Sequence, residues 1–510
     1  MLLDKDLQSI QEVRTLLNKA KEAQAHYALF SQEEVDSICK AMAEAGREAA
    51  PRLAEMAVKE TGFGVVRDKT IKNIVATEMV FNYIQSMRTV GVINRDQQNR
   101  VFEIAEPVGI VAGIIPSTNP TSTTLYKILI SLKARNGIVL SPHPSALRCT
   151  QAAMKVMEDA ALAAGAPSGL IGCLSFPSRE GTQELMSYPH TAVILATGGT
   201  AMVKAAYSSG KPAYGVGPGN VPVFIERTAD LKKAVSDILI SKTFDNGTVC
   251  ASEQAIVTDS PIHERVVAEL KNSGAYFMVP EQEIALGKIL VSPQGTINPK
   301  LVGQSALYLA EKSGFSVPDN TRVLIAQPQG VGPQYPLSRE KLSPVLALYK
   351  EKDWKTACER CIEVINFGGI GHTMGIHSQD DEIIMEFALK KPVFRIIANS
   401  PTTHGAVGFS TGLPPALTLG CGTWGGSSTS DNVTPLHLIN WKRLAYGIRE
   451  VLPDKTTLPV METTTVPALS RTQRNTQKQK TDIIKKECIH PLNEEDIRKI
   501  VSRFLAQKKL

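Results

Sequence analysis

The sequence predicts an α/β protein built on a doubly wound parallel sheet. From about residue 106 to residue 225, short apolar runs alternate with helical segments, and a polar turn with Gly or Pro closes the runs. This alternation is typical of βαβ units, whose strands lie parallel and are covered on both faces. Because 510 residues exceed what a single core usually organises, we expect two or more domains.

The chain before this region is predicted to be helical through about residue 90. Apolar residues recur there at the spacing that places them on one face of a helix. In one segment they are Val35, Ile38, Cys39, Met42 and Ala43. We therefore expect amphipathic helices in the N-terminal part, each with one buried face.

Four apolar runs are expected to form strands of the sheet. They are residues 108–115, 137–140, 191–195 and 221–225. Continuous apolar runs are what strands buried on both faces require. Helical patterns follow the first three runs, at residues 125–134, 146–164 and from Met202 onward.

Three polar turns close these runs, at Pro116–Pro120, Ser141–Pro144 and Thr197–Thr200. In parallel sheets ligands bind at the carboxyl ends of the strands, so the turns predict one nucleotide-sized site. No G-x-G-x-x-G pattern follows any run. Gly198 and Gly199 open a helix whose N–H groups can meet a phosphate or a nicotinamide; alternatively, they serve only the geometry of the turn.

A second α/β region is expected at residues 241–430. It contains Cys250, the segment 340–344 and the glycine-rich stretches 367–375 and 419–426. After it, residues 454–490 are rich in Thr, Pro, Gln, Lys and Arg with few large apolar groups, which predicts a flexible linker.

The last stretch, residues 491–510, predicts an amphipathic helix. Asn493 is a good N-cap residue. The apolar face that follows consists of Ile497, Ile500, Val501, Phe504 and Leu505. A short helix on a long tether cannot bury this face locally, so we expect it to dock on a partner. Folding back onto its own domain is the alternative.

Composition excludes several classes of protein. The net charge is +6, but Lys and Arg are spread along the chain and aromatics make up 5%, so no nucleic-acid partner is expected. No apolar run approaches the roughly 20 residues of a membrane helix, and no signal peptide is evident, which predicts a cytoplasmic protein. Eight scattered cysteines predict free thiols, and Cys358 and Cys361 lack further ligands, so no metal site is expected.

Residues 244–254, Phe-Asp-Asn-Gly-Thr-Val-Cys-Ala-Ser-Glu-Gln, resemble the active-site cysteine loop of the aldehyde dehydrogenase superfamily. The similarity is greatest to its CoA-acylating branch, including the aldehyde half of bifunctional aldehyde–alcohol dehydrogenases. Six further motifs match in order, and the resemblance covers roughly residues 5–450. The motifs are residues 106–111, 115–122, 196–199, 215–222, 340–344 and 369–373.

The resemblance implies an aldehyde dehydrogenase-like fold in three parts. A Rossmann-type parallel-sheet cofactor domain is expected at residues 1–240, and an α/β catalytic domain at 241–430. A small oligomerisation element is expected from about residues 90–105 together with 431–453. A homodimer or homotetramer is implied.

The resemblance also implies site residues. Cys250 is the nucleophile, and a thiolate suits the role because it adds to an aldehyde and later leaves from a reactive thioester. Asn119 and the backbone N–H of Cys250 donate to the oxyanion. Glu340 holds the nicotinamide ribose, although taken alone it reads as a solvated surface acid. His372 tunes the thiolate or assists CoA transfer, with a structural role in its turn as the alternative.

An NAD cofactor is implied, with NADP left open. The other residues expected at its site are Pro116, Thr118, Ser141, His143, Thr197, Gly198, Gly199 and Gly217.

The residue at the general-base position distinguishes the acylating from the hydrolytic branch. Hydrolytic members carry a glutamate there, whereas Val216 occupies the position in this chain. Water is poorly activated without that base, so the thiol of CoA becomes the expected acceptor. The predicted reaction converts acetaldehyde or propionaldehyde, CoA and NAD(P)⁺ to acyl-CoA and NAD(P)H, reversibly. A charged analogue such as sulfoacetaldehyde remains open.

Two other functions stay open. A hydrolytic aldehyde dehydrogenase would use another base, with Glu253 the nearest carboxylate in sequence. A non-enzymatic scaffold would act through residues 491–510. The C-terminal helix, residues 493–510, also resembles encapsulation peptides of acylating enzymes in bacterial microcompartments. That likeness implies docking on shell or cargo proteins and a location in the compartment lumen.

Overall fold

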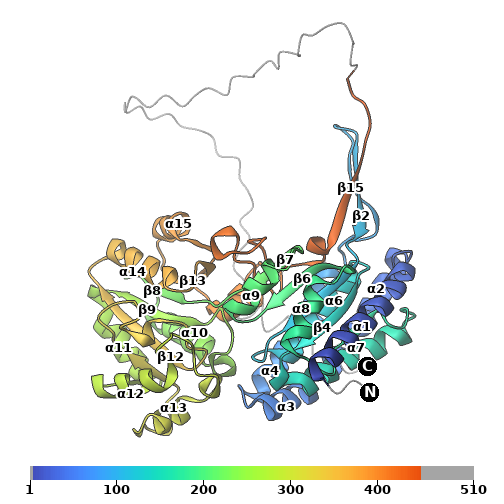
Figure 1. Cartoon of the computed structure of the whole chain (residues 1–510). Coiled ribbons are helices and arrows are strands. Elements are labelled where there is room, and N and C mark those ends of the chain that lie inside the picture. Colours follow the sequence, from blue (N-terminus) through green and yellow to red (C-terminus); the bar gives the residue numbers. More distant parts are fainter. Residues whose placement is uncertain (1–3, 450–510) are drawn as a thin grey trace, which may run out of the picture. The chain divides into compact units, whose positions relative to one another are not determined.

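A five-stranded parallel sheet organises the first part of the chain in the computed structural model, which describes residues 4–449 (Figure 1). Its strand order is β5-β4-β3-β6-β7. The strands are β3 (Ile110–Ile115), β4 (Gly137–Pro142), β5 (Ile171–Cys173), β6 (Thr191–Thr197) and β7 (Ala213–Val216). The three expected strands at 108–115, 137–140 and 191–195 are thereby confirmed. Every residue of β3 and β4 is buried, as continuous apolar runs require.

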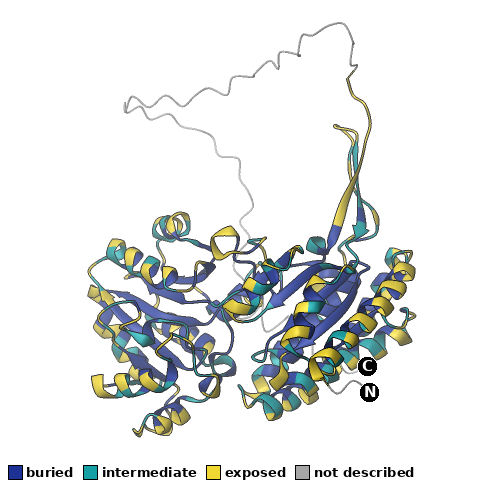
Figure 2. Ribbon diagram, in the orientation of Figure 1, coloured by how far each residue is buried: buried dark blue, intermediate teal, exposed yellow. Residues whose placement is uncertain are grey.

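Helices pack around this sheet (Figure 2). They are α1 (Lys5–Tyr27), α2 (Gln32–Glu48), α3 (Ala50–Thr61), α4 (Val66–Ile74), the π-helical turn Val75–Met79, α5 (Val80–Ile84), α6 (Pro120–Lys133), α7 (Leu147–Ala163), α8 (Arg179–Ser187) and α9 (Thr200–Tyr207). The apolar face expected in α2 is buried, and a capping box between Ser31 and Glu34 starts that helix.

The helix expected at residues 125–134 begins earlier than predicted. α6 starts at Pro120, directly after Asn119. Pro at the first helical position suits the fixed φ of its ring and needs no N–H partner. The first turn is rich in Thr and Ser, so it lacks the apolar periodicity from which the prediction was made. The earlier start places Asn119 at the helix N-terminus.

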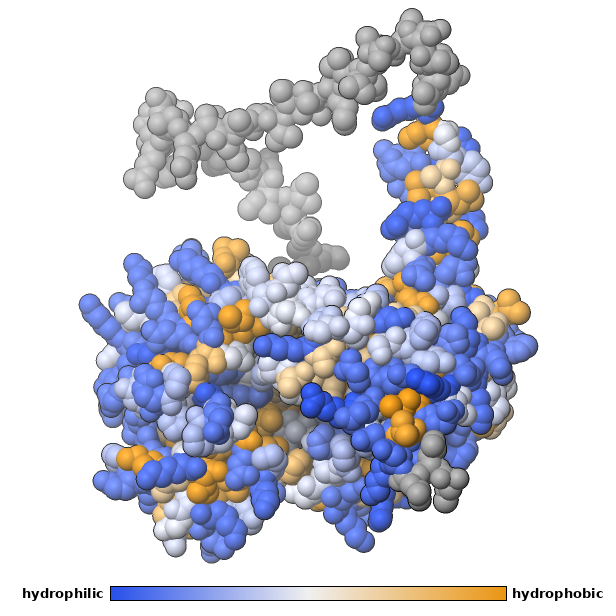
Figure 3. All heavy atoms as spheres, in the orientation of Figure 1, coloured by the Kyte–Doolittle hydropathy of each residue, from blue (hydrophilic) through white to orange (hydrophobic). Residues whose placement is uncertain are grey.

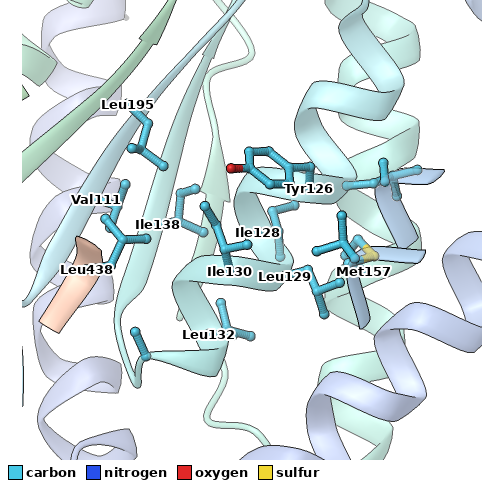
Figure 4. Packing of buried hydrophobic residues seen from close by; sticks show 14 of the residues in the cluster. Val111, Tyr126, Ile128, Leu129, Ile130, Leu132, Ile138, Met157, Leu195 and Leu438 are labelled. Atoms are coloured by element: carbon cyan, nitrogen blue, oxygen red, sulfur yellow. The ribbon is translucent and has the colours of Figure 1, made fainter. Parts of the chain in front are cut away.

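α6 packs in the core behind the first sheet. Figure 4 shows Tyr126, Ile128 and Leu129 of α6 in the cluster that also contains Val111 of β3 and Met157 of α7. All fourteen residues of α6 are buried. A helix enclosed in this way holds its N-terminus rigidly beside the end of β3.

A second sheet contains seven parallel strands in the order β10-β11-β12-β9-β8-β13-β14. They are β8 (Val221–Ile225), β9 (Glu253–Asp259), β10 (Ala275–Phe277), β11 (Val323–Ala326), β12 (Val345–Glu351), β13 (Gly371–His377) and β14 (Val393–Ala398). The accompanying helices are α10 (Leu231–Thr243), α11 (His263–Asn272), α12 (Pro280–Leu290), α13 (Ala306–Lys312), α14 (Trp354–Asn366), α15 (Asp381–Lys390) and α16 (Thr402–Ala406).

The change of sheet falls between β7 and β8, before the boundary expected at residue 240. The strand predicted at 221–225 is present, but it pairs with β9 and β13 of the second sheet. It was expected to continue the first series. An apolar run indicates that a strand is buried on both faces, but it does not indicate which strands pair with it. The pattern therefore could not show where the chain passes from the first sheet to the second.

A three-stranded antiparallel sheet joins two segments that are distant in sequence. β1 (Gly91–Asp96) pairs with β2 (Val101–Pro107), and β2 pairs with β15 (Ile439–Ala445). Most of β15 is exposed, including Trp441 and Leu444. Figure 3 shows apolar side chains among polar ones on the arm that β1, β2 and β15 form. The segments expected to form an oligomerisation element therefore do pair with each other.

The linker expected at 454–490 and the helix expected at 491–510 lie outside the described residues. Within residues 4–449, no helix is long and apolar enough to cross a membrane. That same part of the chain holds no group of three or more His, Cys, Asp or Glu side chains that could bind a metal ion.

Candidate active site

The three turns predicted to share a site follow three neighbouring strands. Pro116 follows β3, Ser141 lies near the end of β4 and Thr197 ends β6. β3 stands between β4 and β6 in the sheet, and the chain leaves it first toward β4 and later returns on its other side. This is the switch point at which parallel sheets open a crevice for ligands.

A mostly apolar pocket contains both predicted reacting residues, Cys250 and Asn119. Its volume is about 60 Å³. The other lining residues are Ile71, Lys72, Val75, Thr123, Thr197, Phe244, Val249, Thr403, His404, Val407, Phe409, Leu417 and Leu419. No Asp or Glu is among these described lining residues.

The turn that carries Cys250 has an unusual backbone. Asp245, Asn246 and Gly247 follow one another with φ values of 50°, 52° and 73°. Left-handed conformations are uncommon for residues with a side chain, although Asp and Asn adopt them more readily than others. Asp245 is held by hydrogen bonds from the backbone N–H of Val65 at 2.7 Å and from Lys69 Nζ at 2.9 Å. The motif Phe-Asp-Asn-Gly thus forms a tight turn at Phe244–Gly247, three residues before Cys250.

The surroundings of the Cys250 thiol favour its protonated form. Burial raises its pKa to about 12, with nearby Glu340 and Cys421 acting in the same direction and Arg395 opposing them. The nucleophilic form of a cysteine is the thiolate, so a nucleophilic role for Cys250 would require the loss of this proton.

Asn119 lies between β3 and α6, with its side chain in the pocket. Lys72 Nζ donates a hydrogen bond to Asn119 Oδ1 at 2.6 Å. Asn119 Nδ2 lies 3.2 Å from Thr118 Oγ1. The acceptor end of the amide is therefore occupied, which leaves its N–H₂ end as the donor for a substrate oxygen.

Glu340 is fastened to the loop between β7 and β8. Its Oε1 accepts the backbone N–H of Gly219 at 3.0 Å. Burial raises the pKa of Glu340 to about 7, against the lowering effects of the Gly219 N–H and Lys242. Glu340 does not line the apolar pocket. Its position beside this loop rather than at the surface favours the role expected from the motif over that of a solvated acid.

His372 is fully buried at the start of β13. Its Nδ1 lies 3.0 Å from Thr373 Oγ1, and its Nε2 has no hydrogen-bond partner among the described residues. Burial lowers the pKa of His372 to about 3, helped by Arg395, so the ring is neutral. His372 does not line the pocket, but its ring and the Cys250 carbonyl oxygen both lie on the Cβ side of Gly219, at 3.1 Å and 2.2 Å from where a Cβ would stand.

The predicted cofactor residues show mixed exposure. Gly198 and Gly199 precede α9, and the start of that helix has no side-chain cap, so its N–H groups are open to a ligand. Ser141 shares a 2.8 Å hydrogen bond with Thr182, so its hydroxyl is engaged within the protein. His143 is exposed and its Nδ1 bonds Ser145 Oγ at 2.8 Å. Pro116 is buried, and Gly217 has open space beside its Cα.

One buried atom at this site fits a bound cofactor. Thr197 Oγ1 is buried and has no hydrogen-bond partner among the described residues, although Thr197 lines the pocket. A buried hydroxyl without a partner costs free energy unless a ligand or water satisfies it. Together with the open N-terminus of α9, it makes the crevice compatible with a nucleotide cofactor.

The general-base position is apolar in three dimensions as well as in sequence. Val216 ends β7 and is buried in the core cluster against which Cys250 also packs. Glu253, the alternative base, starts β9 and its Oε1 accepts the backbone N–H of Thr402 at 3.0 Å. Glu253 does not line the pocket.

Sequence reasoning missed Lys72 and His404, which both line the pocket. Lys72 lies in α4 among ordinary polar residues, and nothing in its spacing distinguishes it from a surface lysine. His404 meets the ring of Phe244 edge to face, with ring centroids 4.7 Å apart. Only the folding of α4 and α16 against the cysteine loop brings these side chains to the site.

Comparison with known proteins now identifies the class. The "Aldehyde dehydrogenase family" model matches residues 6–284, and the chain belongs to this family. Within it, the chain is homologous to the acylating aldehyde dehydrogenases. It is 46% identical over 449 residues to the bifunctional aldehyde-alcohol dehydrogenase AdhE of Escherichia coli, covering 87% of this chain and 50% of that protein. The chain thus spans about half the length of such relatives.

A shorter relative and two solved structures match along nearly their whole length. The acylating sulfoacetaldehyde dehydrogenase of Bilophila wadsworthia is 37% identical, covering 84% of this chain and 94% of that protein. An acetylating aldehyde dehydrogenase from Geobacillus thermoglucosidasius is 54% identical with a TM-score of 0.87, covering 89% of this chain and 100% of that one. A propionaldehyde dehydrogenase from a Clostridium phytofermentans microcompartment is 28% identical with a TM-score of 0.78, covering 85% and 97%.

Proposed function

We propose that this protein is a CoA-acylating aldehyde dehydrogenase that converts a short-chain aldehyde, CoA and NAD(P)⁺ into acyl-CoA and NAD(P)H. The observation that carries the proposal is the pocket itself. Cys250 and Asn119 meet there, and none of its described lining residues is a carboxylate. Such a pocket can form a thioester but offers no carboxylate to activate water.

The first half of the reaction follows from these two residues. The Cys250 thiolate adds to the aldehyde carbon, and the new C–S bond moves one electron pair onto the carbonyl oxygen. Asn119 Nδ2–H and the backbone N–H of Cys250 donate to that oxyanion. A nicotinamide held in the crevice would supply the acceptor for the hydride that leaves the same carbon. When the C=O bond re-forms, the acyl group remains on Cys250 as a thioester.

The second half transfers the acyl group to CoA. The CoA thiolate adds to the thioester carbon, and the bond to Cys250 Sγ breaks as the carbonyl re-forms, which restores the Cys250 thiolate. Exchange of one thioester for another keeps the energy of the bond, so the overall reaction is reversible. A related propionaldehyde dehydrogenase of Rhodopseudomonas palustris, 27% identical with a TM-score of 0.76, has been solved with bound CoA and an acylated cysteine.

The size of the pocket favours acetaldehyde or propionaldehyde. Its volume of about 60 Å³ is well below the ~150 Å³ of an apolar cavity that accommodates benzene. Apolar side chains such as Val407, Leu417 and Leu419 dominate its wall. This lining disfavours a charged substrate such as sulfoacetaldehyde, because the lysine in it, Lys72, already donates to Asn119, Asp245 and Thr248, and an anion without a free partner is costly to desolvate.

The cofactor is proposed to occupy the crevice at the ends of β3, β4 and β6. Thr197, Gly198 and Gly199 would meet it from β6 and α9, while Pro116 and Thr118 would border it at the end of β3. Glu340 would hold the nicotinamide ribose. An engineered glycolyl-CoA reductase with bound NADP⁺ has a TM-score of 0.75 to this chain. Parallel assays with NAD⁺ and NADP⁺ distinguish the two cofactors.

Assembly and location are separate proposals. The exposed arm formed by β1, β2 and β15 would join protomers into a dimer or tetramer, because Trp441 and Leu444 lie uncovered on it. The expected helix at 493–510 would dock on shell or cargo proteins in a microcompartment, a location supported by its amphipathic pattern and by the microcompartment relative. Sedimentation of the full chain and of Leu444→Asp tests the arm.

NADH formation from acetaldehyde and propionaldehyde, followed by absorbance with and without CoA, tests the activity. We expect strict dependence on CoA, with acyl-CoA as the product by mass spectrometry. Cys250→Ser is the matched control because it keeps the side-chain shape and removes the thiolate; it should abolish turnover. Equal rates without CoA, with free acid as the product, would assign the hydrolytic alternative instead.

A further inference from the structure

A buried ammonium group lies directly behind the proposed oxyanion donor. Lys72 has 5% of its surface exposed, and its Nζ donates to Asn119 Oδ1 at 2.6 Å. An ammonium group has three donors and no acceptor. It can therefore face only the oxygen end of the amide, and the opposite end, Nδ2, must point away from it. Lys72 thus determines which end of Asn119 a substrate oxygen meets.

The same lysine is tied to the turn that carries the nucleophile. Lys72 Nζ also donates to the carboxylate of Asp245 and lies 3.0 Å from Thr248 Oγ1. Thr248 in turn donates to Asp245 at 2.6 Å. Asp245 and Thr248 both precede Cys250 in the same loop. A single charged network therefore links the amide of Asn119 to the loop that positions the Cys250 thiol.

The charged groups of this network are coupled through Asp245. Asp245 is shared by Lys72 and by Lys69, whose Nζ lies 2.9 Å from Oδ2. Burial alone would raise the pKa of Asp245, but the two lysines outweigh it and hold that pKa below its usual value. Asp68 belongs to the same network, because its Oδ2 accepts the backbone N–H of Asp245 at 2.7 Å and its charge acts on Lys72, so two carboxylates face the two lysines. Charge-assisted hydrogen bonds in a dry site are also stronger, and they polarise the groups to which they are linked.

We propose that Lys72 is a positioning residue for the oxyanion hole: it fixes the Nδ2–H₂ end of Asn119 toward the oxygen of the Cys250 adduct and polarises that amide as a donor. The inference rests on the proposed roles of Asn119 and Cys250. Lys72 acts through Asn119, so its effect on turnover depends on the presence of that amide.

A double-mutant cycle on the full-length enzyme tests the proposal, with acetaldehyde, NAD⁺ and CoA as substrates. Removing one oxyanion donor typically lowers kcat by about 10²-fold, so we expect losses of that order from both Asn119→Ala and Lys72→Met. Combining them should cost no more than Asn119→Ala alone. KM for the aldehyde should change less than about threefold, because the interaction belongs to the transition state.

Two outcomes overturn the inference. If the losses multiply in the double variant, Lys72 acts independently of Asn119, for example as a direct cation on the oxyanion. If Lys72→Met keeps wild-type kcat while Asn119→Ala does not, the positioning role is absent. Full activity of Asn119→Ala is a different result, because it overturns the proposed role of Asn119 itself.

Lys69→Met is the matched control. It removes an equally buried ammonium from the same carboxylate, but its second contact is the Thr118 carbonyl oxygen at 2.8 Å rather than the Asn119 amide. Its effect on kcat should multiply with that of Asn119→Ala. Alkylation of Cys250 by iodoacetamide, followed by peptide mass spectrometry, should proceed in Lys72→Met at close to the wild-type rate. A normal rate would show that the variant loses activity because Asn119 is mispositioned and not because the site has lost its structure.

A folding defect in Lys72→Met would not end the test. Lys72→Gln keeps a hydrogen-bonding side chain, but an amide can present either end and no longer dictates the orientation of Asn119. We expect this variant to lose kcat in the wild-type background and to lose nothing further in the Asn119→Ala background. Wild-type kcat in Lys72→Gln would overturn the proposal.

Discussion

A Cβ atom placed on Gly219 would stand 2.2 Å from the carbonyl oxygen of Cys250. The same Cβ would lie 3.1 Å from the ring of His372, while the N–H of Gly219 donates to Glu340. At Gly219, the loop between the two large sheets therefore lies against Cys250, His372 and Glu340. Only glycine fits there without moving one of them.

Gly219→Ala should accordingly displace the loop or the cysteine turn. We expect a loss of about 1–3 kcal/mol in the free energy of unfolding, typical of overpacking, and at least a tenfold fall in kcat. Denaturant unfolding and NADH formation measure the two effects. Gly217→Ala, in the same loop, is the control for stability, because a Cβ there meets no atom within 4 Å. Equal unfolding midpoints for the two variants would contradict the contact.

Val216→Glu should restore a carboxylate at the position of the missing base. We expect NADH formation without CoA to appear, with free acid as the product, because a nearby carboxylate can activate water. Val216 is buried among apolar side chains, so the variant should also lose stability. Val216→Gln has a similar shape and no charge, and it should remain dependent on CoA. Strict CoA dependence in both variants would show that more than this residue excludes hydrolysis.

Glu340 should make stability depend on pH. Its pKa is raised from 4.5 to about 7 by burial, so the folded state binds a proton in a range where the unfolded chain has lost it. This contribution is present below about pH 4.5 and is lost as pH rises through about 7. Glu340→Gln should therefore narrow the gap in melting temperature between pH 5 and pH 8. If the difference in melting temperature between pH 5 and pH 8 did not change, Glu340 would not be the source of this pH dependence.

Phe409→Ala should relax the selection for short aldehydes. Phe409 lines the pocket, and truncation to Ala removes its ring from the lining. Because each methylene accommodated in an apolar pocket is worth about 1–3 kcal/mol, we expect the ratio of kcat/KM for hexanal to that for acetaldehyde to rise about tenfold or more. Phe176→Ala is the control, since Phe176 is similarly exposed and lies outside the pocket. An unchanged ratio would mean that other residues limit chain length.

The sequence by itself determined the class of this protein. The apolar runs at β3, β4, β6 and β8 required buried strands, the turns after three of them predicted a ligand site, and the loop around Cys250 with Val216 upstream indicated thioester chemistry without a hydrolytic base. These features are local: each depends on residues a few positions apart, so their periodicity and order can be read along the chain.

Tertiary structure alone decided how those parts meet. It assigned β8 to the second sheet, started α6 at Pro120 so that Asn119 heads a buried helix, and brought Lys72 from α4 to within 2.6 Å of that amide. The physical reason is that hydrogen bonds and ion pairs between distant segments impose no spacing on the sequence. A lysine that orients an amide and a lysine that faces water look the same until the fold surrounds one of them.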